Sequence, residues 1–173
     1  MTKEGRGMKS ALLIGYGNPG RLDDGLGPAF AEAVQTLSIP GLTVDSDYQL
    51  TVEDAVDLAS HDLVVFADAD VSGPEPFYVK RLLPEDSPSL GFSSHSVGPK
   101  ALLSLAKELF ASSPECYLIG IRGYEFDEFG ERLSERAQRN LKEAVGHFAR
   151  SLLVDGRLSE LRADEVPNPK LDE

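Results

Sequence analysis

The chain has 173 residues, long enough for one domain to bury a core without help from disulfides or metals. Its 17 Lys and Arg residues against 29 Asp and Glu residues give a formal net charge of −12, which repels nucleic acids and anionic membrane surfaces. No stretch approaches the roughly 18 apolar residues of a membrane span, and the start of the sequence lacks the apolar segment of a secretion signal. We therefore expect a cytoplasmic protein, monomeric by default, with no nucleic-acid or membrane partner.

The first seventy residues alternate between strand and helix patterns. In chain order they predict a strand at 10–17, a helix at 25–38, a strand at 42–47, a helix at 51–60 and a strand at 62–70. Thr51 and Asp54 have the spacing of a capping box at the start of the second helix. The apolar run from Leu63 to Phe66 is typical of a central strand that is buried on both faces. This alternation predicts a parallel sheet.

The second half of the chain continues the same alternation. It predicts a strand at 77–82, a helix at 99–110, a strand at 115–123 and a helix at 133–152. Tyr78, Lys80 and Arg81 need solvent, which favours an edge position for the first of these strands. Periodicity ends near Asp155, so we expect one domain over residues 1–154 and a flexible acidic tail over residues 155–173. The predicted fold class is α/β: a three-layer α/β/α sandwich with a mixed, mainly parallel sheet.

The stretch "LLIGYGNPGRLDDGLG" has the glycine spacing of a dinucleotide-binding fingerprint at Gly15, Gly17 and Gly20. In that motif the helix begins within the glycine loop, so that its amides face a diphosphate. Here Asp23 and Asp24 intervene before the helix, and a carboxylate about 4 Å from a phosphate costs roughly 4 kcal/mol at a surface-like dielectric. The sequence therefore argues against a nucleotide cofactor.

Several polar residues follow the first and third predicted strands or precede the helix at 99–110. They are Asn18, Asp23, Asp24, Asp68, Asp70 and His95. Because ligands collect at the carboxyl ends of parallel strands, these side chains are expected to converge there. The two carboxylates near the first helix also fit a plain role in capping its free amides. Alternatively, Asp24, Asp68 and His95 supply two oxygens and one nitrogen, a set that suits nickel or zinc.

Other reactive side chains fit structural roles better. Cys116 lies in the apolar run "CYLIGI", as expected of a core residue. His61 is placed at the opposite end of its strand and His147 in the last helix. The sequence has neither the GxSxG turn of serine hydrolases nor the HExxH helix of zinc peptidases. Hydrolysis would therefore need a different arrangement.

An ordered set of motifs resembles the maturation endopeptidases of nickel-iron hydrogenases. The set is "LLIGYGNPGRLDDGLG", then "FADAD", then "SSHSVGPKALLSLAKEL", and finally "YLIGIRGYEFDEFGERLSERAQRNLKEAV". The resemblance covers about Leu12 to Leu153. It implies a phosphorylase/hydrolase-like fold and an enzyme that removes a C-terminal extension from the precursor of a hydrogenase large subunit after nickel insertion.

The same resemblance assigns roles to individual residues. Asp24, Asp68 and His95 match the family's three metal-contacting positions, and they become the expected catalytic and metal-contacting residues. Gly15, Gly17 and Asn18 would shape the loop that presents Asp24. The nickel would be carried by the substrate rather than by the enzyme.

Two alternatives stay open from the sequence. The same ligands would also serve a chaperone that senses nickel and docks on the precursor without cutting it. The opening "LLIGYGNPG" is also similar to that of peptidyl-tRNA hydrolases, but "RLDDGLG" stands where those enzymes carry their catalytic histidine. The segment "DSDYQLTVEDAV" lacks the Gly-rich substrate loop of some maturation endopeptidases, and "EFDEFGER" is a further candidate for choosing the hydrogenase partner.

Overall fold

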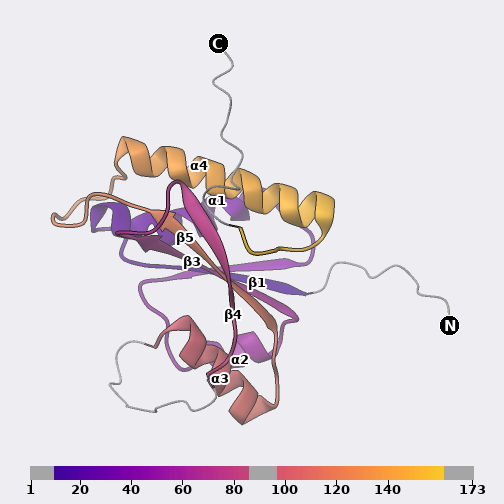
Figure 1. The fold of residues 1–173 in the computed structure, drawn as a ribbon. Helices are drawn as coiled ribbons and strands as arrows, with labels where there is room; N and C mark the ends of the chain where they lie inside the picture. Colours follow the sequence, from indigo (N-terminus) through magenta and orange to yellow (C-terminus); the bar gives the residue numbers. More distant parts are fainter. Residues whose placement is uncertain (1–9, 86–96, 162–173) are drawn as a thin grey trace.

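The computed structural model describes residues 10–85 and 97–161 as a five-stranded sheet between two helical layers (Figure 1). The strands are β1 (Ala11–Tyr16), β2 (Leu42–Asp47), β3 (Leu63–Asp70), β4 (Phe77–Leu82) and β5 (Glu115–Arg122). Their order across the sheet is β2-β1-β3-β5-β4. Neighbouring strands run parallel except for β4, which is antiparallel to β5. The predicted mixed, mainly parallel sheet is confirmed.

Helices cover both faces of the sheet. In Figure 1, α1 (Leu26–Gln35) and α4 (Glu135–Arg150) lie on one face, and α2 (Asp54–Ala59) and α3 (Pro99–Phe110) lie on the other. A 3₁₀ turn, η1 (Leu22–Gly25), precedes α1, and a π-helical turn, η2 (Ser151–Asp155), follows α4. The predicted three-layer α/β/α architecture is confirmed. Over residues 10–85 and 97–161 none of these helices has the length and apolar character needed to cross a bilayer.

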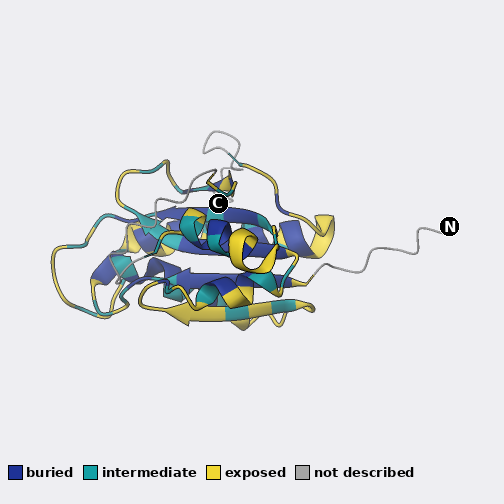
Figure 2. Ribbon diagram, turned by 90° about the horizontal axis from the view of Figure 1, so that it is seen from below, coloured by how far each residue is buried: buried dark blue, intermediate teal, exposed yellow. Residues whose placement is uncertain are grey.

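Each face of the sheet has its own apolar core, because successive side chains of a strand point to opposite faces. Leu13 of β1 packs with Phe30 and Phe148 on the face covered by α1 and α4. Leu12 packs with Phe66 on the other face. Figure 2 shows the buried residues concentrated in the interior strands, whereas the outward faces of the helices are exposed.

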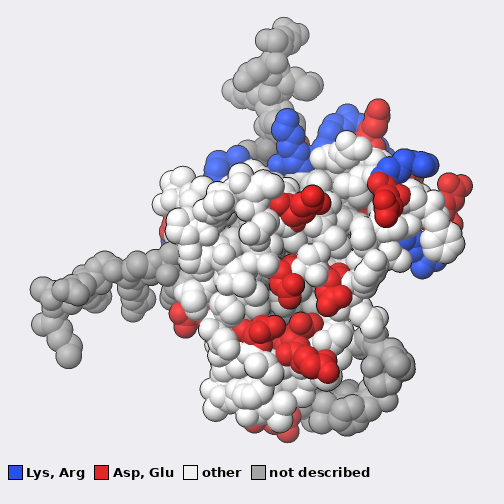
Figure 3. Space-filling view, turned by 180° about the vertical axis from the view of Figure 1, so that it is seen from behind, with Lys and Arg blue, Asp and Glu red and all other residues white. Residues whose placement is uncertain are grey.

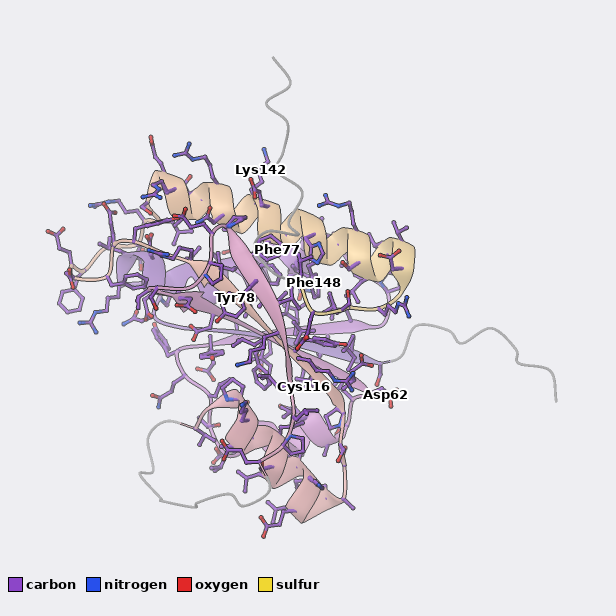
Figure 4. The ribbon with its side chains drawn as sticks, viewed as in Figure 1. Asp62, Phe77, Tyr78, Cys116, Lys142 and Phe148 are labelled. Atoms are coloured by element: carbon purple, nitrogen blue, oxygen red, sulfur yellow. The ribbon has the colours of Figure 1, made fainter. Side chains whose placement is uncertain are left out.

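Figure 4 places single residues in these two cores. Phe77 of β4 and Phe148 of α4 lie near each other in the core between the sheet and α4, and Cys116 lies on the side of the sheet that α3 covers. Burial raises the pKa of the Cys116 thiol to about 12. The thiol therefore stays protonated at neutral pH, and the prediction that Cys116 is a core residue is confirmed.

All the predicted strands and helices are present: β2, β4 and α3 have the predicted bounds, and the others are shorter. β3 lies in the middle of the sheet and β4 at an edge, as predicted, and the side chains of Lys80 and Arg81 are exposed. The helix predicted over residues 51–60 is shorter, because only Asp54–Ala59 is helical. Only one half of the predicted capping box is present: Asp54 Oδ2 accepts a hydrogen bond of 2.8 Å from the Thr51 N–H, whereas no side chain caps the N-terminus of α2.

The packed chain extends beyond residue 154, where the sequence predicts a tail to begin. Leu158 is only 3 % exposed and belongs to the core beneath α4. Leu161 forms a β-bridge with Val79 of β4, with backbone hydrogen bonds of 3.1 and 3.0 Å. Two leucines three residues apart are too short a pattern to predict an element in this segment. Residues 162–173 of the predicted tail lie outside the described part.

We expect Leu158→Ala to lower the free energy of unfolding by about 2–4 kcal/mol, since the change leaves a cavity in the core. Leu153→Ala is the matched control: Leu153 is 59 % exposed, so its loss should cost less than about 0.5 kcal/mol. Urea unfolding of the full-length chain measures both values. Equal stability of the two variants would contradict the packing of Leu158.

Candidate active site

The carboxyl ends of β1 and β3 bring two predicted site residues together. Asp24 lies in η1, in the connection from β1 to α1, and Asp68 lies near the carboxyl end of β3. The two strands are hydrogen-bonded neighbours in the sheet. Asp24 is close enough to Asp68 for its negative charge to raise the pKa of the Asp68 carboxyl. The two carboxylates thus interact electrostatically at this edge of the sheet, and their joint role in a site stays a prediction.

The glycine-rich turn brings the backbone of η1 and α1 close to the end of β1. A Cβ on Gly15 would lie 2.1 Å from the Gly27 carbonyl oxygen, and a Cβ on Gly17 would lie 2.1 Å from the carbonyl oxygen of Asp24. Gly17 also has a φ of +143°, which side-chain-bearing residues rarely adopt. These glycines thus serve close packing of the backbone that carries Asp24.

Asn18 connects this turn to the Asp24 side chain. Its backbone N–H donates a hydrogen bond of 2.8 Å to Asp24 Oδ2, and its own Oδ1 accepts one of 2.9 Å from the Gly20 N–H. One oxygen of Asp24 is therefore fixed, and the side chain remains half-buried. A fixed, half-buried carboxylate can still contact a ligand through its second oxygen.

Asp68 has an unusual environment for a carboxylate. Its pKa is raised from 3.8 to about 6, chiefly by burial. The negative charges of Asp24 and Asp70 add to this rise, and hydrogen bonds from the Tyr16 hydroxyl and the Ala69 N–H oppose it. Burial and Asp68 in turn raise the pKa of Tyr16, so the phenol stays protonated. Asp68 consequently changes its charge close to neutral pH, as a general acid or base must.

Asp70 has the opposite character, although it lies only two residues further along β3. Its Oδ1 accepts hydrogen bonds from the backbone N–H groups of Ser72 and Gly73 at 2.9 and 2.8 Å, and its Oδ2 accepts one from the Tyr78 hydroxyl at 2.8 Å. Burial opposes its ionisation, but these bonds outweigh burial and lower the pKa of Asp70. We infer that Asp70 has a structural role in the turn after β3.

Asp23 does not converge with Asp24, contrary to the sequence-based expectation. It is fully buried and its carboxylate binds Tyr124, Glu125 and Ser134 in the segment between β5 and α4. Neither carboxylate caps α1, whose N-terminus has no side-chain cap. The capping role that the sequence left open therefore does not explain this acidic pair.

The three histidines fall in different places. His95, the third predicted metal contact, lies outside the described residues. His61 is held in the turn after α2, where its Nδ1 lies 2.7 Å from the Asp57 carbonyl oxygen. His147 in α4 packs against the Phe77 ring at 5.5 Å between centroids. His61 and His147 are thus in structural surroundings, as the sequence predicts.

The structure also contains an acidic group that sequence reasoning missed. Ligand oxygens of Asp45, Asp54 and Asp57 lie within 4.8 Å of one another beside β2 and α2. Figure 3 shows acidic side chains across the middle of one face of the molecule, with Lys and Arg mainly along its upper edge. Asp54 and Asp57 are three residues apart in α2, so local spacing brings these two together, whereas the approach of Asp45 from β2 depends on the tertiary structure.

The arrangement at β1 and β3 can support proton transfer during hydrolysis. Two nearby carboxylates with different environments, one fixed by a backbone N–H and one with a raised pKa, can divide the roles of charged ligand and general base. Carboxylate oxygens are also ligands for divalent metal ions. This pair is the strongest candidate for an active site among the described residues.

Comparison with known proteins gives a consistent picture. No family model matches the chain. It is 30% identical over 175 residues to the hydrogenase expression/formation protein HupD of Thiocapsa roseopersicina, covering 93% of this chain and 78% of that protein. The crystal structure of the [NiFe] hydrogenase maturation protease HycI from Thermococcus kodakarensis is similar, with a TM-score of 0.64, 25% identity and coverage of 83% of this chain and 93% of that one. The hydrogenase maturating endopeptidase HybD of E. coli shares the fold, with a TM-score of 0.62, 20% identity and coverage of 89% and 98%.

Proposed function

Because the chain belongs to the family of nickel-iron hydrogenase maturation endopeptidases, we propose that it cuts the C-terminal extension from the precursor of a hydrogenase large subunit. The observation that carries this proposal is the pair formed by Asp24 and Asp68, in which the pKa of Asp68 is raised to about 6. A carboxylate that titrates near neutral pH can take a proton from an attacking water and return it to the leaving amine. The predicted cytoplasmic location and monomeric state belong to the same proposal.

Nickel enters the proposal as part of the substrate. The precursor would present the ion next to the bond to be cut, and Asp24, Asp68 and His95 would contact it through two carboxylates and one imidazole. Such oxygen and nitrogen donors suit a borderline divalent ion. Recognition of the loaded ion would restrict cleavage to precursors in which nickel insertion is complete.

The test is mass spectrometry of a hydrogenase large-subunit precursor after incubation with this protein, in parallel nickel-loaded and nickel-free samples. We expect loss of a C-terminal peptide from the nickel-loaded sample alone. Cleavage of both samples would disprove the role of nickel in recognition. An intact mass in both samples, with binding of the precursor demonstrated, would instead support a chaperone that docks without cutting.

A further inference from the structure

Asp23, the buried neighbour of Asp24, is held by a segment about one hundred residues further along the chain. Its Oδ2 accepts hydrogen bonds from the Tyr124 N–H at 2.8 Å, the Glu125 N–H at 3.0 Å and the Ser134 hydroxyl at 2.7 Å. Its Oδ1 accepts a fourth bond, of 2.8 Å, from the Ser134 N–H. Although burial disfavours its charge, these bonds lower the pKa of Asp23, so the carboxylate stays ionised.

The backbone around Asp23 is tied to the same segment. The Asp23 N–H donates to the Glu125 carbonyl oxygen at 2.9 Å, and the Leu22 N–H donates to that of Gly130 at 2.9 Å. The Gly130 N–H in turn donates to the Gly20 carbonyl oxygen at 2.8 Å. The turn η1 and the segment 123–134 therefore form one hydrogen-bonded unit, with Asp23 at its buried centre.

Asp24 follows on a different side of the same turn. In a 3₁₀ turn, successive side chains are about 120° apart, so the residue after an inward-facing one points elsewhere. Asp23 points to the 123–134 segment, while Asp24 Oδ2 is bound by the Asn18 N–H. The position of the Asp24 carboxylate thus depends on two supports: the Asn18 N–H directly, and the Asp23 anchor through the backbone.

We propose that Asp23 is a positioning residue for the cleavage reaction, which holds η1 against the 123–134 segment so that Asp24 is presented to the nickel-bearing substrate. This inference rests on the proposed function. Asn cannot replace Asp23, because each oxygen accepts at least one hydrogen bond and an amide nitrogen would meet an N–H donor at either position. A misplacement of about 1 Å can cost roughly 100-fold in rate.

The activity test compares Asp23→Asn with the wild-type protein on nickel-loaded precursor. We expect kcat to fall by roughly 100-fold, because the variant misplaces Asp24, which would contact the substrate-held nickel. Phe148→Leu, in the core away from η1, is the control for lost stability, and below its unfolding temperature it should keep its kcat. A folded Asp23→Asn variant with the wild-type kcat would overturn the proposal.

A second measurement does not depend on cleavage. Amide hydrogen exchange at Asn18, whose N–H is bound by Asp24, should become about tenfold faster in Asp23→Asn, while the Ser72 amide, bound by Asp70, keeps its rate. If the wild type does not cut the precursor, the proposed function fails, but this exchange still reports on the anchor. Unchanged exchange at Asn18 would overturn the inference. Should Asp23→Asn not fold, Ser134→Ala, which removes one of the four bonds, should accelerate Asn18 exchange in the same direction.

Discussion

Asp68→Asn is expected to cleave the precursor about 1,000-fold more slowly, since the variant lacks the titrating group that general acid–base catalysis needs. The same variant is expected to be more stable than the wild type at neutral pH. The gain arises because burial raises the pKa of Asp68 to about 6. A carboxyl whose pKa is higher in the folded than in the unfolded state stabilises the fold while it is protonated, below about pH 4. That stabilisation is lost as the pH rises through 6.

The neutral Asn side chain avoids this loss, so the variant should exceed the wild type in free energy of unfolding by on the order of 2 kcal/mol at pH 7.5, and by little at pH 4. Urea unfolding at the two pH values measures the difference. Asp62→Asn is the matched control, because Asp62 is an exposed carboxylate just before the opposite end of β3 (Figure 4). Near-normal cleavage by Asp68→Asn would refute the role of Asp68 in proton transfer.

Gly15→Ala is expected to destabilise the protein by more than about 3 kcal/mol, or to prevent folding, because its Cβ would lie 2.1 Å from the carbonyl oxygen of Gly27 and 2.8 Å from the Ala31 Cβ. Backbone atoms cannot move aside as the end of a flexible side chain can. Relief of this clash requires α1 to move away from β1, and η1 with Asp24 would move with it. Thermal unfolding measures the first effect and precursor cleavage the second.

Gly146→Ala in α4 is the matched control for the Gly15 variant. The added Cβ would meet only the end of the Arg150 side chain, at 3.2 Å, which can rotate away. Removing a glycine from a helix interior should then stabilise the protein by about 0.5–1 kcal/mol. A Gly15→Ala variant as stable as Gly146→Ala would show that the close approach of β1 and α1 is not tight.

The sequence alone predicts most of the fold, because its elements are defined by local periodicity. The apolar run of β3 and the amphipathic pattern of α4 gave correct element types, and the polar positions of β4 gave its edge location. The point at which the packed part of the chain ends was not predicted correctly from the sequence. Leu158 lies in no periodic pattern, and only the core beneath α4 gives it a partner.

For the neighbouring residues Asp23 and Asp24, too, the sequence predicted the approximate location, and the tertiary structure was needed to tell their surroundings apart. Their place after the first strand was enough to put both near the carboxyl edge of the sheet, and the motif resemblance singled out Asp24. Sequence could not separate their roles, since the partners of Asp23 are backbone N–H groups and a hydroxyl 101 to 111 residues away. Local sequence thus determined the order of elements and the edge of the sheet where the candidate site lies. The tertiary structure decided which carboxylate is fully buried against the 123–134 segment and which stays half-buried, because burial and hydrogen bonding depend on contacts distant in the chain.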